Sequence, residues 1–177
     1  MPNIYEDLCN AYIQMDDRQS HYRKVVLQTI WSLPNELAKY LGCAKTFEAD
    51  SISAPLGSNL DTRRVGLCSY DGQKKQIAYN DIEYDDDGHP LFGLFVALER
   101  GQEVYPKRKF YAQCKLSLTS TITRLWVQDS WYKIENFSDQ PDYSAAFAHI
   151  VELLSEVMTY DPFSGGQNKR GIGFISE

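Results

Sequence analysis

Apolar residues recur every three or four positions through the first forty residues, which is the period of an α-helix. Ile4, Leu8, Tyr12 and Met15 share one helical face, so a short helix is expected over 4–15. The polar run 16–20 is expected to end it, and Ser20 suits the N-cap of a second, longer helix that stops at Gly42. Pro34 should kink this helix or begin another. The pattern predicts two N-terminal helices.

From residue 44 the pattern changes to a period of two, which is typical of β-strands. Asp71-Gly72 favours a tight hairpin between strands 64–70 and 76–84. Residues 91–99 are apolar on both faces and should form a central strand. The alternation slips at 128–130, which predicts a bulge inside one long strand. The expected strands are 46–50, 64–70, 76–84, 91–99, 109–119 and 122–134, and 51–62 is expected to be a long polar loop.

The C-terminal part begins with the strongest helical pattern in the chain, over residues 143–160. Its apolar stripe should cover one face of the sheet. Residues 163–177 are Gly-rich and carry Lys169-Arg170, so a flexible tail is expected after one domain over 1–162. The predicted fold class is α+β: an antiparallel meander of about six strands with two N-terminal helices and one C-terminal helix. A more open sheet with helices on both faces is the alternative.

Charge and composition narrow the function classes. The 177 residues carry a net charge of −6, which argues against a protein that binds nucleic acid with its whole surface. No apolar run approaches the ~20 residues of a membrane helix, and the first 17 residues lack a signal-peptide pattern. The four cysteines have no C-x-x-C spacing. A soluble cytoplasmic protein with free thiols, no cofactor and no membrane partner is therefore expected.

An acidic run is the first candidate site. Asp81, Glu83 and Asp85 alternate along a predicted strand, and Asp87 follows. Such a face can dock a basic partner or hold a hard cation. The run fails as an EF-hand because Leu94 stands where the closing glutamate should be, so no metal site is assigned.

The strand over 109–119 carries the second candidate. Gln113-Cys114-Lys115 resembles the (Asp/Glu/Gln)-x-Lys element of some metal-dependent nucleases, in which the lysine supports an attacking water. That chemistry also needs an Asp from the preceding strand, which contains none. Asp87 lies before this strand and Glu99 lies at its end. On the same face, Tyr111, Gln113 and Lys115 also form a candidate binding surface.

Basic pairs at strand ends are the third candidate. Arg63, Arg64, Lys107 and Arg108 could meet at one end of the sheet and bind an anion. Serine-nucleophile and phosphate-loop motifs are absent from the sequence.

These features favour a non-enzymatic regulatory protein that docks on or inhibits another protein. A metal-dependent nuclease or nucleotide-handling enzyme is the alternative, with a nucleic acid or nucleotide as its partner. It would use Gln113, Lys115 and carboxylates from the run 81–87 or Glu99, and it predicts that one of these carboxylates lies close to Lys115. A third possibility is a small-ligand module with a pocket between the last helix and the sheet.

Overall fold

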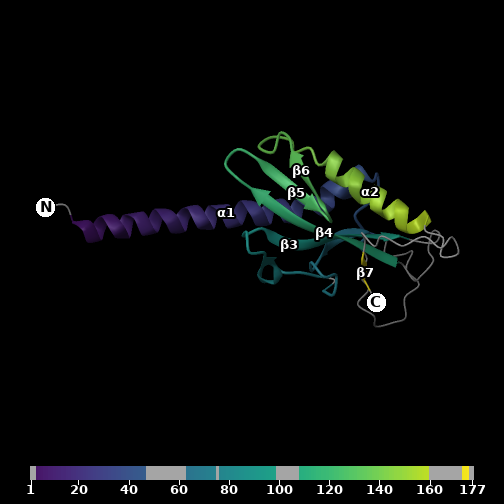
Figure 1. Cartoon of the computed structure of the whole chain (residues 1–177), viewed down its shortest axis with the longest axis horizontal. Helices are drawn as coiled ribbons and strands as arrows, with labels where there is room; N and C mark the ends of the chain where they lie inside the picture. The colour runs from purple at the N-terminus through teal and green to yellow at the C-terminus, as the bar shows by residue number, and fades with distance from the viewer. Residues whose placement is uncertain (1–2, 47–62, 75, 99–107, 160–172, 176–177) are drawn as a thin grey trace. The chain divides into compact units, whose positions relative to one another are not determined.

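A computed structural model describes residues 3–46, 63–74, 76–98, 108–159 and 173–175 (Figure 1). The chain forms two compact units, residues 1–32 and residues 33–177. The first unit is helical throughout its described part, and the second combines the end of that helix with a sheet and a second helix. The α+β class is confirmed. The expected loop 51–62 lies outside the described residues.

A single N-terminal helix, α1 (Ile4–Tyr40), replaces the two that were expected. The polar run 16–20 does not break it, because all five side chains lie exposed on the helix surface, where arginine and glutamine favour helix. The helix also continues through Pro34, which removes only one backbone donor. It ends as predicted at Gly42, whose φ of 65° lets Cys43 N donate to Ala38 O.

The sheet is antiparallel, with the central order β1-β3-β4-β5-β6. Two short strands flank this path: β2 pairs with β3, and β7 pairs with β4. The strands are β1 (Val65–Cys68), β2 (Glu83–Tyr84), β3 (Pro90–Leu98), β4 (Arg108–Leu118), β5 (Thr123–Val127), β6 (Ser130–Ile134) and β7 (Gly173–Ile175). β3 is central and buried on both faces, as its sequence predicts. β7 comes from the segment that was expected to be a tail, and 160–172 lie outside the described residues.

Two predictions about the strands are wrong, one about a pairing and one about a bulge. β1 pairs with β3, and the segment that should have been its hairpin partner holds a 3₁₀ turn (Tyr79–Asp81) and the two-residue β2. The expected bulge at 128–130 is a reversal of the chain, because Gln128 takes a left-handed φ of 57° and separates β5 from β6. Of the expected strand 46–50, Thr46 makes one bridge to Arg63, and the rest lies outside the described residues.

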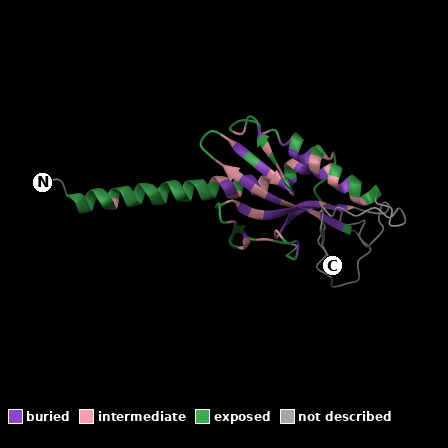
Figure 2. Ribbon diagram, viewed as in Figure 1, coloured by how far each residue is buried: buried purple, intermediate pink, exposed green. Residues whose placement is uncertain are grey.

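The two faces of the sheet differ in what lies on them. One face packs against α2 (Ser144–Thr159), which carries both buried and exposed positions (Figure 2). Its large buried side chains are Phe147, Ile150 and Leu154. Side chains of this size each contribute about 2 kcal/mol when fully buried. The other face, called the polar face here, carries Tyr111, Gln113 and Lys115 of β4 in alternation with buried residues. The candidate site lies on this polar face.

Candidate functional site

A loop of residues 69–74 folds over the polar face and is tied to β4. The Tyr111 hydroxyl donates to Asp71 O at 2.8 Å, and Gln113 Nε2 donates to Tyr70 O at 3.2 Å. Gly72 is buried with a φ of 75°, and a Cβ at this position would overlap the Tyr111 ring. Two of the predicted binding residues, Tyr111 and Gln113, therefore hold this loop in place.

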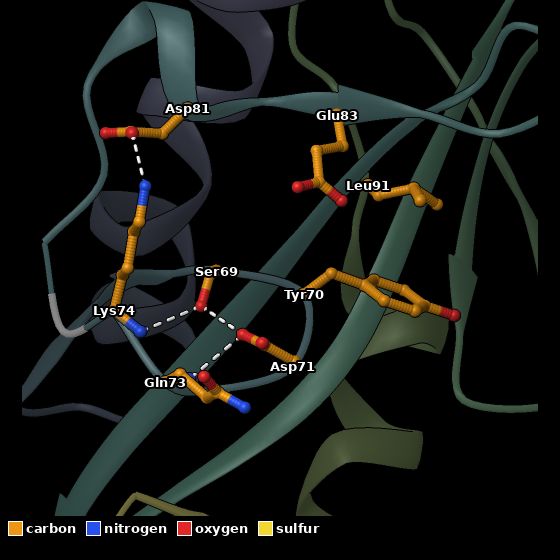
Figure 3. A pocket seen from close by; sticks show the side chains of 8 residues that line it. All are labelled: Ser69, Tyr70, Asp71, Gln73, Lys74, Asp81, Glu83 and Leu91. Carbon is orange, nitrogen blue, oxygen red and sulfur yellow. Dashed lines mark hydrogen bonds and ion pairs between the residues drawn. The ribbon is translucent and has the colours of Figure 1, made fainter.

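Between the loop and β2 lies a small hollow of about 160 Å³ (Figure 3). Lys74 Nζ pairs with Asp81 Oδ1 at 2.8 Å along its rim, and Asp81 Oδ2 accepts the Ala78 N–H at 2.7 Å. Figure 3 shows the Glu83 carboxylate turned into the hollow opposite Tyr70. Its lining residues are Ser69, Tyr70, Asp71, Gln73, Lys74, Asp81, Glu83 and Leu91.

The hollow is electronegative. A hydrogen bond from Ser69 lowers the pKa of Asp71, and the hydrogen bond from Lys74 lowers the pKa of Asp81. Three carboxylates and one ammonium group, that of Lys74, line the hollow. Drug-sized ligands need roughly 300 Å³ or more, so this hollow suits a single cationic head group such as that of arginine or lysine.

Asp85 connects the acidic run to the sheet. Its Oδ1 accepts the backbone N–H groups of Asp87 at 3.1 Å and His89 at 2.8 Å, and its Oδ2 pairs with Lys115 Nζ at 3.0 Å. Desolvation raises the pKa of Asp85, but the hydrogen bonds from His89 and Lys115 outweigh it and lower the value to about 2. The same hydrogen bond raises the pKa of Lys115. Asp85 and Lys115 are therefore a fixed ion pair at neutral pH.

One group of possible metal ligands is present among the described residues. Ligand atoms of Asp85, Asp87 and His89 lie within 4.8 Å of one another. Asp85, however, already binds Lys115 and two backbone donors, so its negative charge is neutralised without a metal. The arrangement can stabilise the loop 85–89 by itself, and a metal would compete with Lys115 for the same carboxylate.

A row of aromatic side chains continues the site across the sheet. The register places Lys115 beside Trp126 and Trp126 beside Trp131. The Lys115 ammonium lies 5.1 Å from the Trp126 ring centroid, and the His89 and Trp131 rings are 5.2 Å apart. Sequence reasoning missed this row, because treating 122–134 as one strand hides that residues 126 and 131 are cross-strand neighbours.

The residues of the nuclease hypothesis have other partners. The Gln113 amide donates to Tyr70 O, and the Lys115 ammonium is paired with Asp85. The predicted proximity of Lys115 to a carboxylate of the acidic run is present, but Glu99 lies outside the described residues.

The predicted anion-binding residues lie at the opposite end of β3. Arg63 sits over the Phe95 ring at 5.3 Å from its centroid, and Lys109 lies 5.2 Å from the same centroid. Arg108 is exposed at the start of β4, Arg64 lines a second hollow, and Lys107 lies outside the described residues. The two arginines that precede β1 are thus not brought to one common point.

The second hollow is apolar and has a volume of about 380 Å³. It lies between α2 and β3, where a ligand pocket was expected as an alternative. Its lining residues are Leu41, Cys43, Arg64, Val96, Ala97, Leu98, Val151, Leu154, Ser155 and Met158.

Buried thiols offer no reactive centre on the sheet. Cys68 and Cys114 are free and buried. Desolvation raises the pKa of Cys68 to about 12 and also raises the pKa of Cys114, so neither forms the thiolate that a nucleophile needs.

Comparison with protein-family models, with curated protein sequences and with solved structures finds no match to this chain. Among the described helices, none is both long and apolar enough to span a bilayer. The inference about function therefore rests on the chemistry of the residues themselves.

Proposed function

We propose that this chain is a non-enzymatic regulatory protein that docks on a basic segment of another protein through its acidic segment, residues 79–87. The electronegative hollow beside this segment carries the proposal, because its size and charge suit one arginine or lysine side chain. Five of these nine residues are acidic, and the run begins with Tyr79 and contains Tyr84.

Aromatic side chains add contact area to the acidic segment. Tyr79 is 60% exposed, Tyr84 is 46% exposed and Trp131 is 42% exposed. Tyrosine and tryptophan are enriched among residues that contribute most to binding, since they bury a large area for few rotatable bonds. Acidic groups around such anchors select basic partners and speed their association.

The docking surface is held in a fixed shape before any partner arrives. Asp85 links the acidic segment to Lys115 on β4, and Asp81 links it to Lys74. A preorganised surface loses less entropy on binding than a mobile one. We place this function in the cytoplasm, where the four free cysteines would remain reduced.

Affinity capture from the native cells tests the proposal. Wild-type protein should retain a stoichiometric partner, and the charge-reversing variant Glu83→Lys should lose it at least tenfold. Glu156→Lys on α2 is the matched control, because it makes the same charge change at an exposed position outside the site. Equal capture by wild type, Glu83→Lys and the control would contradict docking through the acidic segment.

The apolar hollow under α2 supports a second candidate function, the binding of a small apolar ligand. Its volume of about 380 Å³ lies within the usual range for ligand pockets. Native mass spectrometry of the purified protein should show bound small molecules in wild type. The variant Leu154→Trp, which fills the hollow, should show none. A ligand-free wild-type protein would contradict this candidate.

The nuclease alternative has less support, because Gln113 and Lys115 each serve another part of the fold. Incubation with labelled DNA, RNA and nucleotides in the presence of Mg²⁺ or Mn²⁺ tests it directly. We expect no turnover, and activity that Lys115→Ala abolishes would establish the enzyme instead.

A further inference from the structure

The first unit of the chain exposes a stripe of large apolar side chains that is interrupted by one polar residue, Gln19. Five of them define what is called the helix stripe here, and their exposed fractions are 75% for Tyr5, 63% for Leu8, 64% for Tyr12, 42% for Met15 and 36% for Tyr22. Ile4, at 72% exposure, flanks the stripe. A surface of this kind is costly in water and marks an interaction site.

The spacing of the stripe is that of a coiled-coil seam. Its residues follow one another by three and four positions alternately, with Gln19 filling the place between Met15 and Tyr22. On the opposite side of the helix, the central positions are Asn10, Asp17 and Lys24, which are all exposed and polar. A helix with this pattern is built to pair with another helix of the same period.

We propose that the helix stripe pairs with the stripe of a second copy of this chain, so that the protein forms a homodimer. Residues 5–22 span about 27 Å of helix. Facing stripes would bury roughly 1,000 Å² in total, which is about the minimum for a specific interface. A self-complementary surface with two-fold symmetry is the commonest way in which soluble proteins associate.

Charge selects the orientation of the two helices. In a parallel pair, Arg18 of each copy would lie beside Arg23 of the other, because these residues occupy the flanking positions that meet across the seam. An antiparallel pair can place Tyr5 opposite Tyr22, Leu8 opposite Gln19 and Tyr12 opposite Met15 of the second copy. This register sets no like charges opposite one another. The geometry therefore favours an antiparallel dimer.

Sedimentation velocity of the full chain between 1 and 200 μM tests the association. Wild type should shift from monomer to dimer across this range, and Leu8→Glu should remain monomeric throughout. Asn10→Glu introduces the same side chain on the polar side of the helix and should dimerise like wild type. Circular dichroism should show that both variants keep the helix content of wild type. A wild-type monomer at 200 μM, whatever other molecule the stripe binds, or a dimer of Leu8→Glu, would overturn the proposal.

A cross-link tests the orientation separately. The antiparallel register places Cys9 of one copy beside Asp16 of the other, so oxidised Asp16→Cys protein should form disulfide-linked dimers through Cys9. Adding Cys9→Ser should abolish them. Dimers that persist without Cys9 would overturn the antiparallel register.

Discussion

Asp85 joins the acidic segment to the sheet through both of its carboxylate oxygens. One oxygen closes the loop 85–89 through the N–H groups of Asp87 and His89, and the other pairs with Lys115. The side chain is only 19% exposed, so the ion pair is partly shielded from water and salt. Asp85 thus fixes the position of the acidic segment on the sheet through hydrogen bonds and an ion pair.

Replacing this carboxylate should destabilise the fold in a pH-dependent way. The pKa of Asp85 is lowered to about 2 in the folded chain, below its ordinary value of 3.8. The charged form therefore stabilises the fold above pH 4 by about 1 kcal/mol, since solvent screens part of the ion pair, and this contribution is lost as pH falls from 4 toward 2.

Urea unfolding of Asp85→Asn at several pH values measures the effect. The free energy of unfolding should be lower than that of wild type by about 1 kcal/mol at pH 6, and the difference should shrink below pH 4. Asp86→Asn is the control, because Asp86 is exposed, and it should change stability by less than about 0.5 kcal/mol. A difference that stays constant from pH 6 to pH 2.5 would exclude the ion pair as its source.

At the scale of elements, the loop 69–74 decides the shape of the site. Asp71 accepts a hydrogen bond from Ser69 Oγ and another from Gln73 N, and Ser69 Oγ accepts one from Lys74 N. These side-chain oxygens accept backbone N–H groups that would otherwise pair with a neighbouring strand. The chain therefore turns here and β1 does not continue. Asp71-Gly72 is a turn as its sequence indicates, but it forms a loop over β4 and not a two-stranded hairpin.

A pair of glycine variants separates the packing of this loop from its backbone conformation. Gly72 and Gly88 both have positive φ, 75° and 80°, but a Cβ at Gly88 would meet nothing within 4 Å. Both changes to alanine carry the backbone cost of about 1 kcal/mol. Gly72→Ala should cost a further ~1–3 kcal/mol, since its methyl group must displace Tyr111.

Thermal unfolding of the two alanine variants provides the comparison. Equal losses of stability in Gly72→Ala and Gly88→Ala would show that the loop does not pack on Tyr111. The additional loss should also shrink when Tyr111 is first changed to alanine, because the overlapping ring is then gone.

Long elements with an unbroken local period are predictable from this sequence, and they include β3, β4 and α2. Their type depends on residues that are near in the chain. The loop 69–74, which separates β1 from its expected partner, is fixed by side chains that bond to the backbone, and the turn at Gln128 is fixed by a left-handed backbone conformation. Local periodicity reveals neither feature. The acidic run and Lys115 are recognisable as polar candidates in the sequence. Their ion pair and the neighbouring tryptophans follow only from the register of five strands, β2 to β6.

At the scale of the whole molecule, charge is unevenly distributed along the sheet. The acidic segment lies at the end where β3 begins, and Arg63, Arg64 and Arg108 lie where it ends. Nine residues of strand separate these ends by about 30 Å, which is several Debye lengths at physiological salt. The arginines would therefore oppose the proposed docking of a basic partner at the negative end only weakly.

The proposed self-association and the proposed docking depend on different residues, so either proposal can fail without the other. The helix stripe lies within residues 5–22 of the first unit. The acidic segment 79–87, the hollow beside it and Trp131 belong to the second unit. The affinity of Leu8→Glu for the docking partner, measured per chain, should therefore equal that of wild type. Glu83→Lys should form dimers as wild type does.

The most direct test of the docking surface is a titration of ¹⁵N-labelled protein with a hexa-arginine peptide, followed by NMR. Amide signals of 69–74 and 79–87 should shift saturably, those of α2 should not, and hexa-glutamate should cause no change. Glu83→Lys should weaken the response at least tenfold, and Glu156→Lys should preserve it. Absence of a saturable shift in wild type, or an identical response from Glu83→Lys, would contradict the proposed docking of a basic partner at this surface.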